Sequence, residues 1–294
     1  MSTLPSSPSP DPAEAPPASD PLAPEPLVAE APLPAPIVAE AAPIVAEAPL
    51  TAPMPERIPF VDQEPPGPRR PLLAAAITSA VVTAVSFFSP DKYAATLVGV
   101  SFLAATWWLV LRHDERTVRA YGLSLGGVLE PTPLDPRRMA RDAAQAVGWA
   151  LLLIVVIFPI FWLGYRAAWH PRMHFSFRMP ASLFDEVAGQ LVVIALPEEA
   201  FFRGYLQSAL DRAWAPRWRI LGADLGPGWI VAAAIFAVGH YLTIHHPARL
   251  AVFFPALVFG WLRKRTGGVG SSMLFHAACN LFSATLGRGY GITL

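Results

Sequence analysis

After residue 70, long apolar stretches without charge alternate with shorter segments that carry Arg, Lys, Asp and Glu. A helix needs roughly 20 consecutive apolar residues to cross the hydrocarbon core of a bilayer. Stretches of about this length therefore predict membrane-spanning helices. We expect an all-α fold, a polytopic membrane helical bundle of seven or eight spans, of which seven can be placed: 71–89, 93–111, 143–165, 184–204, 226–246, 248–264 and 269–287.

The sixth of these stretches is short for a span. Only 13 uncharged residues separate Arg249 from Arg263, and Pro255 interrupts them. Such a segment crosses a membrane only if charged side chains at its ends reach the headgroups or if neighbouring helices bury it. Whether residues 248–264 cross fully is left open by the sequence.

The distribution of Lys and Arg predicts the orientation of the chain, because cytoplasmic loops carry an excess of these residues. With the N-terminus inside, the inner segments hold fifteen of them and the outer segments six, leaving out Arg203. The count predicts a multi-pass protein of the cell (inner) membrane with a cytoplasmic N-terminus and its C-terminus outside. Basic positions near Pro136 to Gln145 predict an amphipathic piece among the headgroups.

The first 70 residues differ from the rest of the chain. They hold most of the 33 prolines and three near-repeats, which begin at Pro26, Pro36 and Pro43. Frequent proline disfavours regular structure, so we expect a disordered Pro/Ala-rich tail with polyproline II character. The predicted organisation is a tail at 1–70, an N-terminal transmembrane region at 71–180 and a C-terminal transmembrane region at 181–294.

Composition and charge agree with a membrane protein. Of 294 residues, 53% are hydrophobic and only 15% are charged, against ~25% charged in ordinary soluble domains. A formal net charge of zero excludes the basic footprint of a nucleic-acid-binding protein. A single cysteine, Cys279, excludes an intrachain disulfide. The lipid bilayer is therefore the expected partner, and nucleic acid is not.

Two adjacent carboxylates, Glu198 and Glu199, follow the apolar run 191–196 in the fourth predicted span. A charge near the middle of a bilayer costs at least ~2.5–3.5 kcal/mol, so intramembrane carboxylates indicate a functional site. On a helix, Glu199 and Arg203 share a face, while Glu198 points ~100° away. We expect Glu199 to form an orienting pair with Arg203, which leaves Glu198 free to hold a proton or a water.

Two further groups of polar residues occur in the later spans. Phe236 and His240 are four residues apart, as are His276 and Asn280, and this spacing places each pair on one helix face. With the two carboxylates, the imidazoles and the amide suffice for hydrolysis by an activated water. A base removes the proton of the water, and donors stabilise the oxyanion that forms.

In order and spacing, these motifs resemble the CPBP family of intramembrane endopeptidases, also called the CAAX-processing and bacteriocin-processing or Abi family. The family signatures are Glu-Glu-x-x-x-Arg, Phe-x-x-x-His and His-x-x-x-Asn/Asp, and the resemblance covers about residues 184–286. It implies that Glu198 is the general base, that His240 holds the water, and that His276 and Asn280 form the oxyanion side. The remaining motif residues, Glu199, Arg203 and Phe236, would support the site, and no cofactor is expected.

The resemblance implies a glutamate-dependent intramembrane protease. Its substrate would be a membrane-anchored protein or peptide, cut near a prenylated C-terminus or a C-terminal sorting signal in the manner called myxosortase. Two alternatives stay open. Glu198, His240 and His276 would also suit three zinc ligands of a metal-dependent protease. A non-catalytic bacteriocin-immunity or scaffold protein of the membrane would not need Glu198 for its function.

Overall fold

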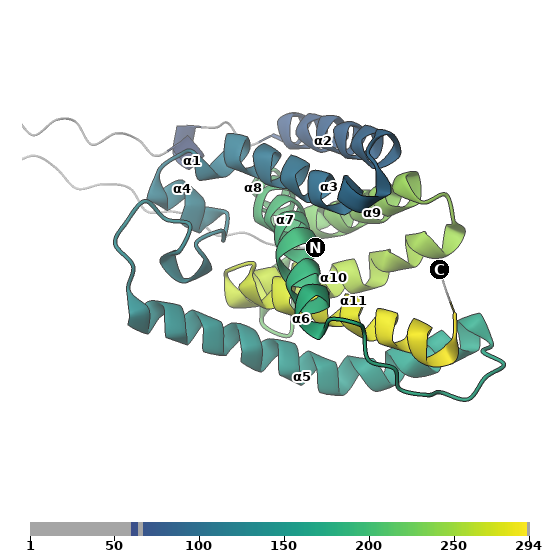
Figure 1. Ribbon diagram of the computed structural model, residues 1–294. Helices are drawn as coiled ribbons and strands as arrows, with labels where there is room; N and C mark the ends of the chain where they lie inside the picture. Colours follow the sequence, from purple (N-terminus) through teal and green to yellow (C-terminus); the bar gives the residue numbers. More distant parts are fainter. Residues whose placement is uncertain (1–59, 64–66, 293–294) are drawn as a thin grey trace, which may run out of the picture. The chain divides into compact units, whose positions relative to one another are not determined.

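The computed structural model describes residues 60–63 and 67–292, and helices dominate in this part of the chain. The all-α fold class is thereby confirmed. Figure 1 shows the arrangement of the helices. The first half contains α1 (Phe60–Gln63), α2 (Arg69–Phe88), α3 (Asp91–Thr106), η1 (Trp107–Leu111), α4 (Glu115–Ala120), η2 (Leu125–Gly127) and α5 (Pro136–Trp169). The second half contains α6 (Leu183–Ala188), η3 (Gly189–Ala195), α7 (Leu196–Glu199), η4 (Ala200–Gln207), α8 (Ser208–Ala213), α9 (Pro227–Thr243), η5 (Pro247–Val252), α10 (Phe253–Thr266) and α11 (Gly270–Tyr290).

A two-stranded hairpin, which the sequence analysis did not predict, lies between α8 and α9. Strand β1 (Trp218–Ile220) pairs antiparallel with β2 (Ala223–Leu225). At the turn, Leu221 has φ 46° and Gly222 has φ 81°. Positive φ at both central residues belongs to the tight turns that match the twist of a hairpin.

Three helices of the described residues are long and apolar enough to cross a membrane, judged by length and composition: α2, the continuous Asp91–Leu111 helix, and α5. They cover the first three of the seven predicted spans. The 34-residue α5 is longer than the third predicted span, because it also includes the basic segment expected among the headgroups. Apolar α9 has only 17 residues.

The other predicted spans are also helical, but their helices are shorter or more polar than these three. Residues 184–204 lie in a continuous helical run that carries Glu198, Glu199 and Arg203, which lower its mean hydropathy. The short sixth stretch forms α10, whose 14 residues rise only ~21 Å at 1.5 Å per residue. The hydrocarbon core is ~30 Å thick. By itself, α10 is therefore too short to cross.

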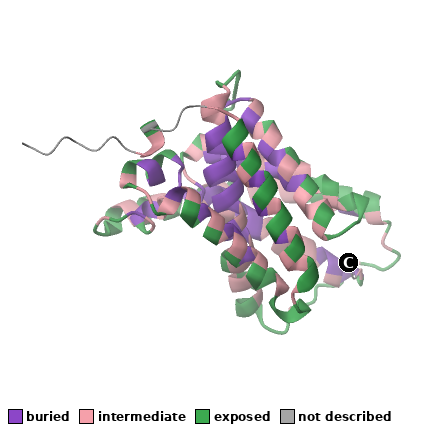
Figure 2. Cartoon of the chain, turned by 90° about the horizontal axis from the view of Figure 1, so that it is seen from above, coloured by how far each residue is buried: buried purple, intermediate pink, exposed green. Residues whose placement is uncertain are grey.

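Large apolar side chains cover the outside of α5. Among them, Leu151 is 56% exposed, Val155 73% and Leu163 67%. Figure 2 shows exposed residues along the outer sides of the helices and buried ones between them. Soluble proteins rarely expose apolar patches of this extent, whereas lipid tails solvate them without cost. With the three apolar helices, this surface is that of a membrane protein.

The predicted tail lies largely outside the described residues, but its last part differs from the prediction. The ring of Phe60 stacks on His113 with centroids 3.6 Å apart. The backbone N–H of Phe60 donates to Oδ2 of Asp114, and that of Val61 donates to Oγ1 of Thr117. These contacts hold α1 against α4, and residues 69 and 70 already belong to α2.

A buried carboxylate ties α4 to the beginning of α5. Arg138 donates to both oxygens of Glu130 at 2.7 and 2.6 Å, and Arg119 adds two bonds at 3.0 and 2.9 Å. The bonds from Arg138, followed by those from Arg119, lower the pKa of Glu130 to about 2. Because the folded-state pKa is lowered, this stabilisation is present at neutral pH and is lost only as the pH falls from 4.5 toward 2.

The helical run Leu183–Ala213 contains two π-helical stretches, η3 and η4, on either side of α7. Such stretches are rare and are frequent at functional sites. Pro197 in α7 lacks an N–H and disturbs the hydrogen-bond ladder before it. Helix α3 packs closely here, because a Cβ on Gly99 would lie only 2.4 Å from the carbonyl oxygen of Val193.

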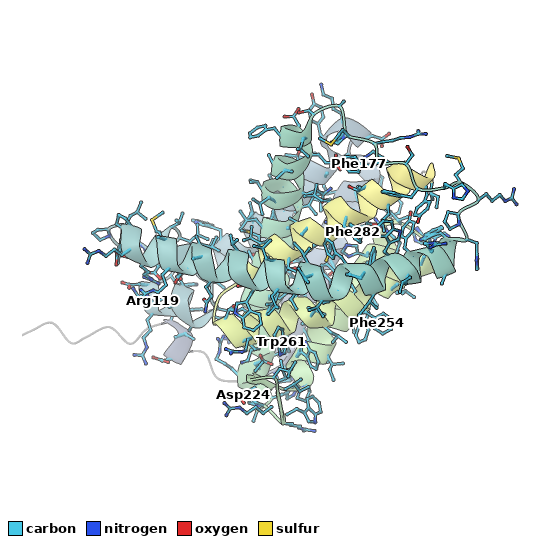
Figure 3. The ribbon with its side chains drawn as sticks, turned by 90° about the horizontal axis from the view of Figure 1, so that it is seen from below. Arg119, Phe177, Asp224, Phe254, Trp261 and Phe282 are labelled. Atoms are coloured by element: carbon cyan, nitrogen blue, oxygen red, sulfur yellow. The ribbon has the colours of Figure 1, made fainter. Side chains whose placement is uncertain are left out.

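Helix α11 packs along α5, which joins the N-terminal and C-terminal predicted regions (Figure 3). The ring of Phe158 stacks on Phe282 at 4.2 Å, and Trp162 donates to the hydroxyl of Tyr290 at 2.8 Å. Helix α3 packs on η4 through Phe102, which contacts the rings of Phe201 and Phe202. The boundary proposed at residue 180 stays a prediction.

Candidate active site

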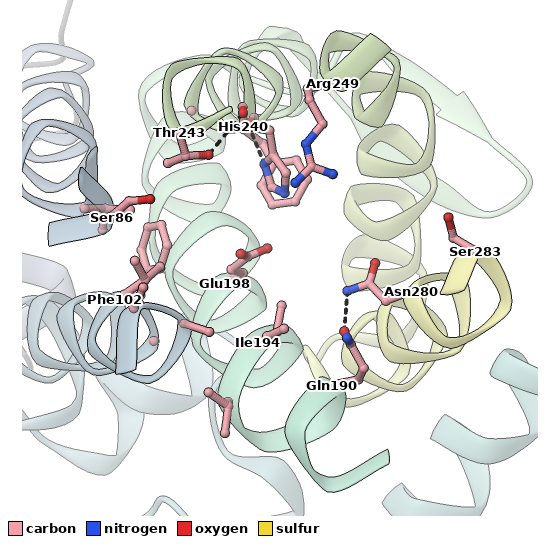
Figure 4. A pocket seen from close by; sticks show the side chains of 18 of the residues that line it. Ser86, Phe102, Gln190, Ile194, Glu198, His240, Thr243, Arg249, Asn280 and Ser283 are labelled. Atoms are coloured by element: carbon pink, nitrogen blue, oxygen red, sulfur yellow. Dashed lines mark hydrogen bonds between the residues drawn. The ribbon is translucent and has the colours of Figure 1, made fainter. Parts of the chain in front are cut away.

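Glu198 lies in the wall of an open cavity of about 700 Å³ between α2, α3, the η3–α7 segment, α9 and α11. His240 of α9 and Asn280 of α11 line the same cavity. Figure 4 shows the three side chains arranged around this space. Only 13% of the Glu198 side chain is exposed. Its Oε2 atom is buried and has no hydrogen-bond partner among the described residues.

Directly behind this wall, Glu199 is fully buried and contacts two cationic or protonatable side chains. Its Oε1 accepts from Nη1 of Arg203 at 2.8 Å and lies 2.9 Å from Nδ1 of His276. Arg203 also donates to the carbonyl of Ala256 at 3.3 Å. A buried charge is tolerated only with such partners. The pair therefore links α7 and η4 to α10 and α11.

Aromatic rings enclose this buried pair. The guanidinium of Arg203 lies over the ring of Phe236 at 4.3 Å and over that of Phe259 at 5.1 Å. Phe259 stacks on the imidazole of His276 at 4.7 Å, and Phe236 contacts the ring of His240 at 4.4 Å. Cation–π contacts of a desolvated guanidinium contribute ~2 kcal/mol. Phe236 thus touches both the buried pair and the cavity-lining histidine.

The hydrogen bonds of the two histidines fix their tautomers. Nδ1 of His240 lies 3.0 Å from the carbonyl oxygen of Phe236. A carbonyl only accepts, so Nδ1 carries the proton and Nε2 presents a lone pair. Nδ1 of His276 donates to Glu199 by the same reasoning, because the carboxylate is paired with a guanidinium. Nε2 of His276 then lies 3.8 Å from Oε2 of Glu198.

Asn280 has one partner and spare hydrogen-bonding capacity. Its Nδ2 donates to Oε1 of Gln190 at 2.9 Å. A carboxamide nitrogen carries two hydrogens, so the second N–H of Asn280 is left for a ligand in the cavity. Gln190 was not among the predicted residues. The available signal was a polar amide inside the apolar span predicted at 184–204.

The structure therefore brings the predicted residues together in two layers. Glu198, His240 and Asn280 line the cavity, whereas His276 lies behind Glu198 among the buried groups. No cluster of three or more His, Cys, Asp and Glu side chains suited to a metal ion occurs in residues 60–63 and 67–292. The zinc ligand set predicted as an alternative stays a hypothesis about Glu198, His240 and His276.

A helical membrane protein with one carboxylate at a cavity wall and a second carboxylate buried behind it is the class that fold and site define. Residues 180–282 match the model of the family described as Type II CAAX prenyl endopeptidase Rce1-like. The resemblance to the CPBP family is thereby confirmed for this part of the chain, and it indicates a CAAX-type intramembrane protease in general terms. No curated protein and no solved structure matches the chain.

Proposed function

We propose that the protein is a glutamate-dependent endopeptidase that hydrolyses a peptide bond near the C-terminus of a membrane-tethered protein. The supporting observation is that the carboxylate-bearing side chain of Glu198 lines the wall of a cavity that His240 also lines. The carboxylate and an imidazole Nε2 without a proton are two acceptors for one water. An activated water is what peptide hydrolysis requires.

In the proposed reaction, Glu198 removes a proton from the water while His240 accepts a hydrogen bond from it. The water oxygen then attacks the scissile carbonyl carbon, and the π electrons of the C=O bond move to the carbonyl oxygen. The second N–H of Asn280 donates to this oxyanion. Collapse of the intermediate breaks the C–N bond, and Glu198 returns the proton to the leaving amine. Charge-stabilising donors of this kind typically contribute ~10²–10³ in turnover each.

His276 contacts Glu199 rather than the cavity, and its Nε2 faces Glu198. We propose that it positions Glu198 and shares the proton that Glu198 receives. This differs from the oxyanion role implied by family resemblance, in which His276 and Asn280 act on the same atom. Support comes from burial, since His276 is only 4% exposed while Asn280 lines the cavity.

Variants that lack His276 or Asn280 distinguish the positioning role proposed for His276 from the oxyanion role proposed for Asn280. The same variants test the zinc alternative. We expect Asn280→Ala to lower kcat by ~10²–10³ with little change in its pH profile, and His276→Ala to shift the acidic limb of the profile. If both acted as one oxyanion unit, the double variant would be little worse than one single variant. Metal content is measured on the same preparations. Bound zinc that disappears with His276 but not with Asn280 would show a metal-dependent enzyme.

The substrate class is proposed from the family description, which names a prenyl endopeptidase. To test this, the purified protein is incubated in vesicles with a peptide whose fourth residue from the C-terminal end is an S-farnesyl cysteine. Mass spectrometry should detect a released tripeptide. A protein that leaves this peptide intact but trims C-terminal sorting signals in cells would favour the myxosortase-like alternative.

We propose that the protein crosses the cell membrane several times with its N-terminus in the cytoplasm and its C-terminus outside. The excess of Lys and Arg in the inner segments supports this orientation. Reporter fusions after residues 141 and 265 should read inside, and a fusion after Leu294 should read outside. Because α10 is short, an inside reading at the C-terminus would mean that residues 248–264 do not cross.

A further inference from the structure

Two arginines line the cavity near the proposed catalytic residues, and they differ in their partners. Nη1 of Arg288 forms an ion pair with Oε1 of Glu186 at 2.8 Å, so its charge is balanced within the protein. Arg249 of η5 pairs with no carboxylate among the described residues. Its Nε is buried and without a hydrogen-bond partner there. Of the two arginines, Arg249 is therefore the one that no carboxylate of the described residues contacts directly.

Arg249 lies beside His240, and its guanidinium points toward the cavity rather than away from it (Figure 4). It is held there by η5, the short helix that joins α9 to α10. Asn280 and Ser283 of α11 also line this cavity and supply further polar groups. A guanidinium that no carboxylate contacts directly keeps its hydrogen-bond donors free for an anionic ligand in the cavity.

The planar guanidinium donates two parallel hydrogen bonds to a carboxylate, which makes arginine the usual residue for carboxylate recognition. A phosphate has similar chemistry, so a lipid headgroup is the competing source of an anion. The carboxylate is favoured because Arg249 shares its cavity with Glu198 and His240, where a peptide end would have to lie for hydrolysis. The site therefore fits the end of a peptide chain.

We propose that Arg249 binds the C-terminal carboxylate of the substrate. The proposal rests on the proposed peptidase function and deepens it. Arg249 and Glu198 line one cavity of about 700 Å³, within the ~300–1,000 Å³ range of small-ligand sites. Because Arg249 and Glu198 line the same cavity, a carboxylate anchored at Arg249 would place the scissile bond a few residues from the end of the chain.

The test compares two peptides that differ only at the C-terminus. Each carries an S-farnesyl cysteine as the fourth residue from its C-terminal end. One ends in a free carboxylate and the other in a carboxamide. The wild-type protein in neutral-lipid vesicles should cleave the acid with kcat/KM ~10–100-fold higher than the amide, as expected for a charged hydrogen-bonded pair. Arg249→Gln should lose this preference, and Arg249→Lys should retain part of it. Arg219→Gln on the exposed hairpin is the matched control.

Equal cleavage of acid and amide by the wild-type protein would overturn the carboxylate assignment. So would an Arg249→Gln variant that loses both activities in proportion, because that pattern indicates a structural role. Repeating the assay with anionic lipid distinguishes the lipid headgroup, which would weaken the acid preference by occupying Arg249. If neither peptide is cleaved, fluorescence anisotropy of their binding decides. If the acid then binds more tightly than the amide and this difference requires Arg249, the carboxylate-binding role of Arg249 is supported although the proposed peptidase function fails. Equal binding of acid and amide would reject the carboxylate-binding role.

Discussion

Glu198→Gln is expected to lower the rate of peptide cleavage by ~10²–10⁴-fold, which is the usual contribution of a general base. The amide keeps the shape of the side chain but cannot accept a proton from water. Glu198 makes no hydrogen bond through Oε2 to any described residue, and Glu199 is not paired with it. The substitution should therefore leave the abundance and the thermal stability of the membrane-inserted protein unchanged.

The measurement is turnover of the farnesylated peptide by wild-type and variant protein purified side by side, with thermal unfolding recorded on each sample. Asp224→Asn is the control, because this exposed carboxylate lies on the hairpin away from the cavity. Retained turnover in the Glu198→Gln variant would remove the general base from the mechanism. A non-catalytic scaffold or immunity function would instead survive the substitution in cells.

Local spacing accounts for what the sequence predicted well. The four-residue spacing of Glu199 and Arg203 places them on one helix face, and their side chains lie 2.8 Å apart. The two adjacent carboxylates diverge by ~100°, and only Glu198 reaches the cavity. Helix period and apolar length likewise predicted the helices now seen at α2, α3 and α5.

Contacts between segments far apart in the sequence could not be predicted from local spacing. His276 and Asn280 are four residues apart, which on a helix means a ~40° rotation and a ~6 Å rise. That offset suffices for His276 to contact Glu199 while Asn280 contacts Gln190. The sequence does not indicate these partners, which are 77 and 90 residues away. Arg249 was likewise not singled out as a site residue, since nothing local shows that η5 brings it to the cavity.

The hydropathy pattern treats every uncharged stretch alike, so it does not separate the three helices that are long and apolar enough to cross a membrane from the shorter or more polar helices of the later stretches. The π-helical stretches around α7 have no local sequence signal beyond Pro197. Helix α3 approaches the first of them closely at Gly99. Polar helices that pack inside the bundle need not be as hydrophobic as helices that face lipid, so mean hydropathy underestimates their burial.

The largest stability effect is expected from breaking the buried pair of Glu199 and Arg203. Glu199→Gln leaves the guanidinium, which is only 1% exposed, without its carboxylate. Arg203→Met leaves the carboxylate with His276 alone. Removing one partner of a buried ion pair typically costs ~3–5 kcal/mol. Each single variant should therefore be scarce in the membrane and unfold at lower temperature.

The double variant Glu199→Gln with Arg203→Met should recover much of this loss, because it leaves no unpaired charge and keeps the side-chain volume. Arg116→Met is the matched control, since its ion pair with Asp62 is exposed and such pairs contribute only ~0–1 kcal/mol. Abundance and thermal unfolding are measured for all four variants. Single variants that are as stable as the wild type but inactive would show that the pair acts in the reaction rather than in holding α7 to α10 and α11.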